Sequence, residues 1–131
     1  MASRRRKTGQ ALVEFALVLP VLMMLILGAI ELGRAWMVRH VITSAAREGA
    51  RAGVIMGATA SDVEAAVATH LDAANLTAGS TVSMEGVGPG AAPGDETWVE
   101  VRYALNTLTG GFVPGWSGTV ELTHRAVMRH E

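Results

Sequence analysis

The chain has 131 residues, of which half are hydrophobic and none is cysteine, so disulfide bonds and thiolate metal sites are excluded. The formal net charge of −1 conceals an asymmetry, because residues 1–9 hold four of the eleven Lys and Arg residues and none of the twelve acids. No second basic stripe follows this cluster, which argues against a nucleic-acid-binding surface.

The N-terminal cations stand directly before a strongly apolar segment. Residues 15–30 carry no charge, and extension back to residue 11 gives twenty residues in which Glu14 is the only ionisable group. A bilayer core of about 30 Å requires about twenty helical residues, so residues 11–30 are predicted to cross a membrane once. A basic cluster beside a span favours the cytoplasmic side, which predicts that the rest of the chain lies outside the cytoplasm. This orientation signal consists of Arg4, Arg5, Arg6 and Lys7.

The helical pattern does not stop at the end of the apolar segment. No proline and no cluster of turn residues follows it for more than twenty residues, so one helix is predicted from about Gln10 to Gly53, with a bend at Pro20. Such a helix is about 65 Å long, half in lipid and half outside. The alternative is a secretory signal peptide cut near Ala29, but the apolar run is long for one and the cleavage pattern is weak.

The outer half of this helix is rich in charged pairs and small side chains. Small residues between positions 44 and 53 permit close approach of another helix or of a sheet, and Gly53 equally suits a helix C-cap. Two exposed ion pairs at i,i+3 spacing are expected, Glu31 with Arg34 and Glu48 with Arg51.

A second, amphipathic helix is predicted for residues 61–74. Ser61 and Glu64 have the spacing of a capping box, and apolar residues then recur at helical intervals. His70 falls on the apolar side and is expected to be partly buried packing rather than a ligand, since no second His or carboxylate shares its face.

Three strands are predicted after this helix, over residues 81–85, 97–105 and 119–128. The second and third alternate apolar and polar residues, which is typical of a sheet with one buried face. Long loops rich in glycine separate the strands. The apolar face needs a cover, and the two helices can supply it. We therefore expect an α+β fold, with a small three-stranded antiparallel sheet packed on the outer half of the long helix and the second helix alongside.

At the start of the apolar segment the chain resembles a known family. The heptapeptide GQALVEF at residues 9–15 resembles the G-x-x-x-x-E-[FY] processing motif of type IV prepilins and of Flp-type pilins. Residues 8–54 are similar nearly throughout to the TadE-like family of pilin-related proteins, and the ending AVMRHE is similar to the usual ending of that family. The middle of the chain carries no family motif.

The resemblance implies a processing site and an assembly residue. A prepilin peptidase would cut between Gly9 and Gln10 from the cytoplasmic side. Glu14, followed by the aromatic Phe15, would then be the fifth residue of the mature chain and would neutralise the new amine, in its own chain or in an adjacent subunit. The nine-residue leader fits this mode of processing.

The resemblance also implies the class of function. It describes a pilin-like minor pseudopilin of a tight-adherence (Tad, Flp or type IVb) pilus or secretion system, with a part in cell adhesion. Its partners would be the membrane, the prepilin peptidase, other pilins or pseudopilins, and platform proteins of pilus assembly. It would lie in the bacterial cytoplasmic membrane as a single-pass protein and enter a surface pilus. The chain would divide into a leader (1–9), a membrane half-helix (10–30), an outer half-helix (31–57) and a body (58–131).

No catalytic constellation stands out, so we expect no enzyme activity, no cofactor, no metal and no small-molecule substrate. The four histidines show no metal-ligand spacing. Phe112 and Trp116, on a glycine-rich loop, are candidate partner contacts, and packing back on the sheet edge is the alternative. The alternative function is an unprocessed, membrane-anchored binding module outside the cytoplasm.

Overall fold

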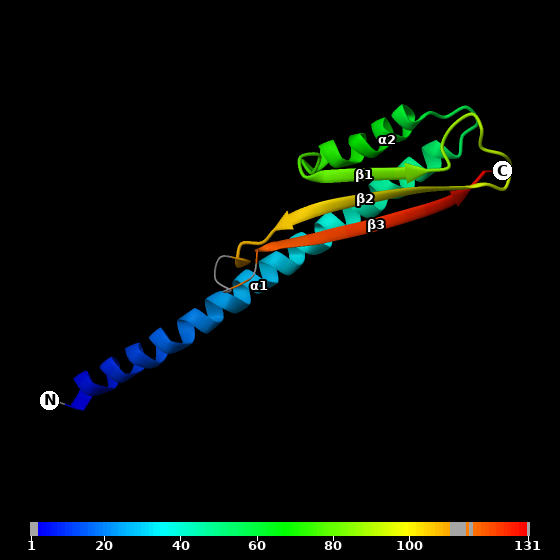
Figure 1. Ribbon diagram of the computed structural model, residues 1–131. Coiled ribbons are helices and arrows are strands. Elements are labelled where there is room, and N and C mark those ends of the chain that lie inside the picture. The colour runs from blue at the N-terminus through cyan, green and yellow to red at the C-terminus, as the bar shows by residue number, and fades with distance from the viewer. Residues whose placement is uncertain (1–2, 111–114, 116, 131) are drawn as a thin grey trace.

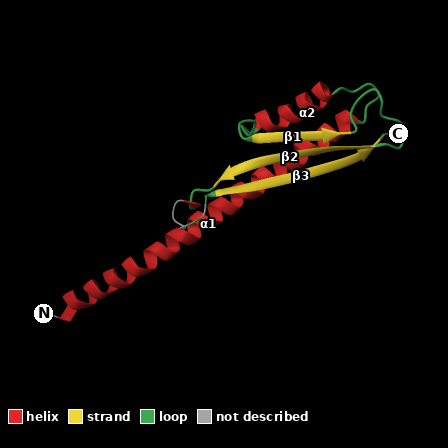
Figure 2. Ribbon diagram, viewed as in Figure 1, coloured by secondary structure: helices red, strands yellow, loops and turns green. Residues whose placement is uncertain are grey.

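The computed structural model describes residues 3–110, 115 and 117–130, with side chains from residue 9 onward. The elements follow in the order α1 (Ser3–Gly53), α2 (Ala60–Ala73), β1 (Ser80–Glu85), β2 (Glu96–Asn106) and β3 (Thr119–Arg129). The N-terminal part of α1 stands alone as a bare rod, while α2 and the sheet pack along its C-terminal half (Figures 1 and 2). The predicted α+β architecture is confirmed.

The long helix α1 begins earlier than predicted. It starts at Ser3 rather than near Gln10 and continues without interruption through Pro20. Arginine and lysine are good helix formers and no proline precedes residue 20, so the leader is compatible with a helix despite Gly9. The result is one helix of 51 residues that serves both the apolar segment and the body.

The helix α2 is capped two residues before the predicted position. Thr59 is the N-cap, with an extended backbone conformation; its amide donates to Asp62 Oδ2 at 2.8 Å, and the Asp62 amide donates to Thr59 Oγ1 at 3.3 Å. The capping box predicted at Ser61 and Glu64 is therefore wrong. The sequence offers two overlapping boxes, and the earlier one adds two residues to the helix.

The buried stripe of α2 follows i,i+4 spacing. Val63, Val67 and Leu71 are buried, whereas His70 is exposed. The expectation that His70 is partly buried is wrong, because the stripe is only one residue wide and His70 lies beside it.

The sheet is antiparallel, with the order β1-β2-β3. Val82 of β1 pairs with Val101 of β2, and Val99 of β2 pairs with Ala126 of β3. These residues belong to the predicted inward faces, and Val99 and Val101 are fully buried. The strand predictions are confirmed to within two residues at each end.

The core lies between the C-terminal half of α1, α2 and the inner face of the sheet. Small residues of α1 line this contact, and Ala45, Ala46 and Ala50 are fully buried. A Cβ added at Gly53 would come within 2.9 Å of Thr97 Cγ2. The predicted close approach is therefore confirmed, and it involves both a helix and a sheet.

Candidate functional site

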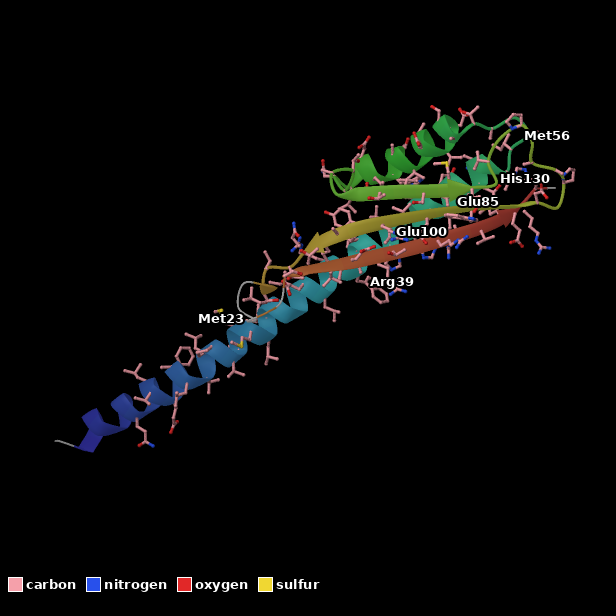
Figure 3. All side chains as sticks on the ribbon, in the orientation of Figure 1. Met23, Arg39, Met56, Glu85, Glu100 and His130 are labelled. Carbon is pink, nitrogen blue, oxygen red and sulfur yellow. The ribbon has the colours of Figure 1, made fainter. Side chains whose placement is uncertain are left out.

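The apolar half of α1 has no protein partner among the described residues. None of its described side chains between residues 9 and 30 is buried, and Leu12, Phe15, Leu17 and Leu25 are each more than 60% exposed. Met23, labelled in Figure 3, lies on this bare rod. By length and composition, α1 is the one helix of the described chain able to cross a membrane. An apolar surface of this extent is most favourably covered by lipid, which indicates a membrane anchor.

The candidate processing and assembly residues lie at the beginning of this surface. Gln10 Nε2 donates to Glu14 Oε1 at 3.3 Å, so the two side chains meet across one helical turn. Glu14 and the neighbouring Phe15 are exposed. Gly9 is exposed as well, and beyond its own helical turn no heavy atom lies within 4 Å of a Cβ built on it. The backbone at this position is therefore not shielded by the body.

Two candidate groups lie partly or wholly outside the described residues. The backbone of Arg4, Arg5, Arg6 and Lys7 is helical, but their side chains are not among those described. Phe112 and Trp116 themselves are outside the described residues. The structure therefore leaves both the orientation signal and the aromatic loop contacts as predictions.

The helix is tied to the sheet where the apolar segment ends. Glu31 accepts hydrogen bonds from the Thr109 amide at 2.8 Å and from Thr109 Oγ1 at 2.7 Å. Arg34 Nη1 donates to the carbonyl of Asn106 at 3.5 Å. The hydroxyl of Thr109, and then its amide, lowers the pKa of Glu31 below its ordinary value. Glu31 is thus held ionised at the membrane end of the body.

These contacts replace the ion pair that the sequence predicts. Glu31 and Arg34 form no salt bridge among the described side chains, because Arg34 instead binds the last residue of β2 and Glu31 binds Thr109, three residues further on. The second predicted pair, Glu48 with Arg51, is confirmed. Sequence spacing identifies a local partner, whereas Thr109 lies 78 positions away from Glu31.

A polar cluster at the opposite end of the body was not predicted. Thr97 Oγ1 lies 2.7 Å from the Gly86 carbonyl and 2.7 Å from His130 Nε2, and both side chains are buried. Because the threonine has one proton, it donates to the carbonyl and accepts from a protonated Nε2. The alternation of β2 extends one step back from Val99 to Thr97, and this signal could have placed Thr97 inside.

No metal centre is formed in the part of the chain that is described, where no three His, Asp or Glu side chains converge. The helix and the body together instead define a class of protein. A single exposed apolar helix anchors the chain and continues into a small α+β body that packs on it.

The comparisons with known proteins agree with this class. The model of the family of TadE-like proteins matches residues 9–51, which is nearly the whole of α1 from the processing motif onward. The match confirms the resemblance to TadE-like proteins over the long helix, and the sheet and α2 lie outside the matched residues. No curated protein and no solved structure matches the chain.

Proposed function

We propose that the chain is a minor pseudopilin of a Tad-type pilus or secretion system. A prepilin peptidase cuts it between Gly9 and Gln10, and the mature protein assembles with other pilins through the exposed half of α1. The leader of residues 1–9 stays cytoplasmic, residues 10–30 cross the membrane, and residues 31–57 carry the body outside. Platform proteins of the assembly machine then receive the anchored subunit.

The observation that carries this proposal is the pairing of Gln10 with Glu14. The glutamine Nε2 lies 3.3 Å from the carboxylate, so an amine created at residue 10 begins within one helical turn of the same anion. A carboxylate near the end of a membrane span is unfavourable unless it has a partner or a function. A new chain end supplies a cation in the membrane, within the chain or from an adjacent subunit.

Exposure supports the same mechanism. The body does not cover Gly9, so the bond that follows it is accessible to a peptidase, and the apolar face beyond it is also free of the body. Phe15, next to the carboxylate, is 61% exposed and available to an adjacent helix. Assembly through this face exchanges lipid contacts for helix contacts without unfolding the body.

The first test is the mass of the N-terminal peptide of the membrane-associated protein. The proposal predicts a mature chain that starts at Gln10. A chain that starts at Met1 or Ala2, in cells whose other pilins are processed, contradicts it and leaves the unprocessed anchored binding module. A start near Glu31 would instead identify a cleaved secretory signal.

The second test separates assembly from insertion. Glu14→Gln removes the charge at nearly constant shape, and Glu64→Gln removes an exposed charge on α2 as the matched control. Glu14→Gln is expected to insert into the membrane normally but to lose copurification with other pilins, whereas Glu64→Gln retains both. Normal copurification of Glu14→Gln counts against assembly through this residue.

A further inference from the structure

The body reaches below the outer end of the membrane span. Gly28 and Leu32 of α1 line an apolar pocket of about 270 Å³ together with Leu105 of β2 and Val120 of β3. Gly28 lies two residues before the end of the span at Ile30, which is about 3 Å along the helix. The membrane end of the sheet is therefore level with the edge of the hydrocarbon core.

The hydrogen bonds of Glu31 hold the membrane end of the sheet at this level along α1. Glu31 is the first charged residue after the apolar segment, and it holds Thr109 through both the amide and the hydroxyl. Figure 1 shows the same end of the sheet turned toward the bare part of α1, while the C-terminus lies at the far end. The polar layer of a bilayer adds about 5–7 Å beyond the core. Held by Glu31, Thr109 is placed at the level of that layer.

The side chain next to Thr109 is apolar and more than half exposed. Leu108 is 56% exposed, and Leu32, on the helix at the same level, is 72% exposed. Ile30, the last residue of the span, is 48% exposed, so exposed apolar side chains continue along α1 from the span to Leu32. An exposed apolar patch that begins at the hydrocarbon edge is most favourably covered by lipid.

We infer that Leu108 and Thr109 form a second membrane contact, in which Glu31 holds Thr109 so that Leu108 inserts into the lipid headgroup layer. The occupant of this surface is the bilayer of the anchored protein. The inference rests on membrane anchoring alone and is independent of processing at Gly9. This contact holds the body against the membrane surface. The anchored protein is then attached to the bilayer at two points, the spanning part of α1 and Leu108.

The absence of cysteine allows this contact to be measured on the full chain. Single substitutions Leu108→Cys, Val127→Cys and Leu25→Cys each receive a nitroxide label, in vesicles of phosphatidylcholine and phosphatidylglycerol. Val127 is 53% exposed, close to the value for Leu108, but lies near the far end of β3, and Leu25 lies within the span. The readout is the accessibility of the label to oxygen relative to a water-soluble nickel chelate.

The label at residue 108 is expected to give an oxygen-to-nickel ratio several-fold above that at residue 127 and below that at residue 25. A ratio at residue 108 equal to that at residue 127 overturns the inference, because the loop then stands in water. Neither outcome depends on whether the leader has been removed.

A second variant tests the role of Glu31. Thr109→Val in the Leu108→Cys chain removes the hydroxyl that binds Glu31, and Thr119→Val removes a hydroxyl at the same end of the sheet that binds Asn106 instead. Thr109→Val is expected to lower the ratio at residue 108, while Thr119→Val leaves it unchanged. Equal ratios in the two variants contradict the part assigned to Glu31. Thr109→Val is also made in the Val127→Cys chain, where an unchanged spectrum of the label verifies that the sheet is folded.

Discussion

Gly49 of α1 lies directly against Val67 of α2. A Cβ built on the glycine would come within 2.5 Å of Val67 Cγ2 and within 3.2 Å of Val99 Cγ1. The glycine therefore allows α2 and the sheet to meet on one point of the long helix. Both valines are fully buried, and their branched side chains have little room to turn away.

Gly49→Ala is expected to destabilise the body by about 1–3 kcal/mol, because the added methyl group overpacks the core. The matched control is Gly33→Ala, also in α1, where no heavy atom lies within 4 Å of the added Cβ. That change is expected to be neutral or to stabilise the helix by up to about 1 kcal/mol. Urea unfolding of the full chain in detergent micelles measures both. Equal stability of the two variants would contradict the close approach.

The capping position of α2 can be tested with one pair of variants. Thr59→Ala removes the hydroxyl that accepts from the Asp62 amide and is expected to lower stability by about 0.5–2 kcal/mol. Ser61→Ala, inside the first turn, is expected to have an effect close to zero. The opposite ranking in urea unfolding would restore the capping box that the sequence predicts.

Thr97 is expected to contribute more to the stability of the body than the small size of its side chain implies. Thr97→Val leaves the Gly86 carbonyl and the His130 ring without their shared hydroxyl, and a lost buried hydrogen bond costs about 1–3 kcal/mol. Thr123→Val makes the same change at an exposed position of β3 and is expected to be nearly neutral. Thermal unfolding followed by circular dichroism compares them. A Thr97→Val protein as stable as Thr123→Val would show that the cluster adds nothing.

The stability of the body should depend on pH through His124. Burial, followed by the charges of Arg47 and Arg39, lowers the pKa of His124 below its ordinary value. The unfolded chain then binds a proton more readily than the native chain. Stability is therefore complete above about pH 6.5 and falls as the pH decreases toward the lower native pKa.

His124→Gln is expected to remove this loss of stability at acidic pH. Arg47→Gln is expected to make the loss smaller, because it removes one of the two cations that oppose protonation of His124. Unfolding midpoints measured between neutral and mildly acidic pH test both variants. A pH dependence that His124→Gln leaves intact would assign the effect to other groups.

The sequence predicts the architecture because periodicity records which face of each element is buried. Alternation around Val99 and Val101 predicts a strand with one buried face. The unbroken apolar run before Glu31 predicts a membrane-spanning helix. The capping of α2 was misplaced because Thr59 and Ser61 both begin acceptable boxes, and local spacing does not decide between them.

The contacts of Glu31 and His130 could not be read from the sequence. Their partners lie 78 and 33 positions away, so only the folded chain brings them together. Spacing alone favoured Arg34 as the partner of Glu31. Of the candidate site, the positions of Gly9 and Glu14 came from the motif, whereas the membrane end of the body came from tertiary structure.

Because α1 is unbroken, its membrane part and the body that packs on it move together as one rigid unit. A helix of 51 residues measures about 77 Å, so tilting it by about 10° moves its far end by about 13 Å. No hinge between the span and the body absorbs such a motion. A force that tilts the membrane end of α1 therefore tilts the outer end by the same angle. A pull on the membrane end is likewise transmitted to the body through one continuous helix.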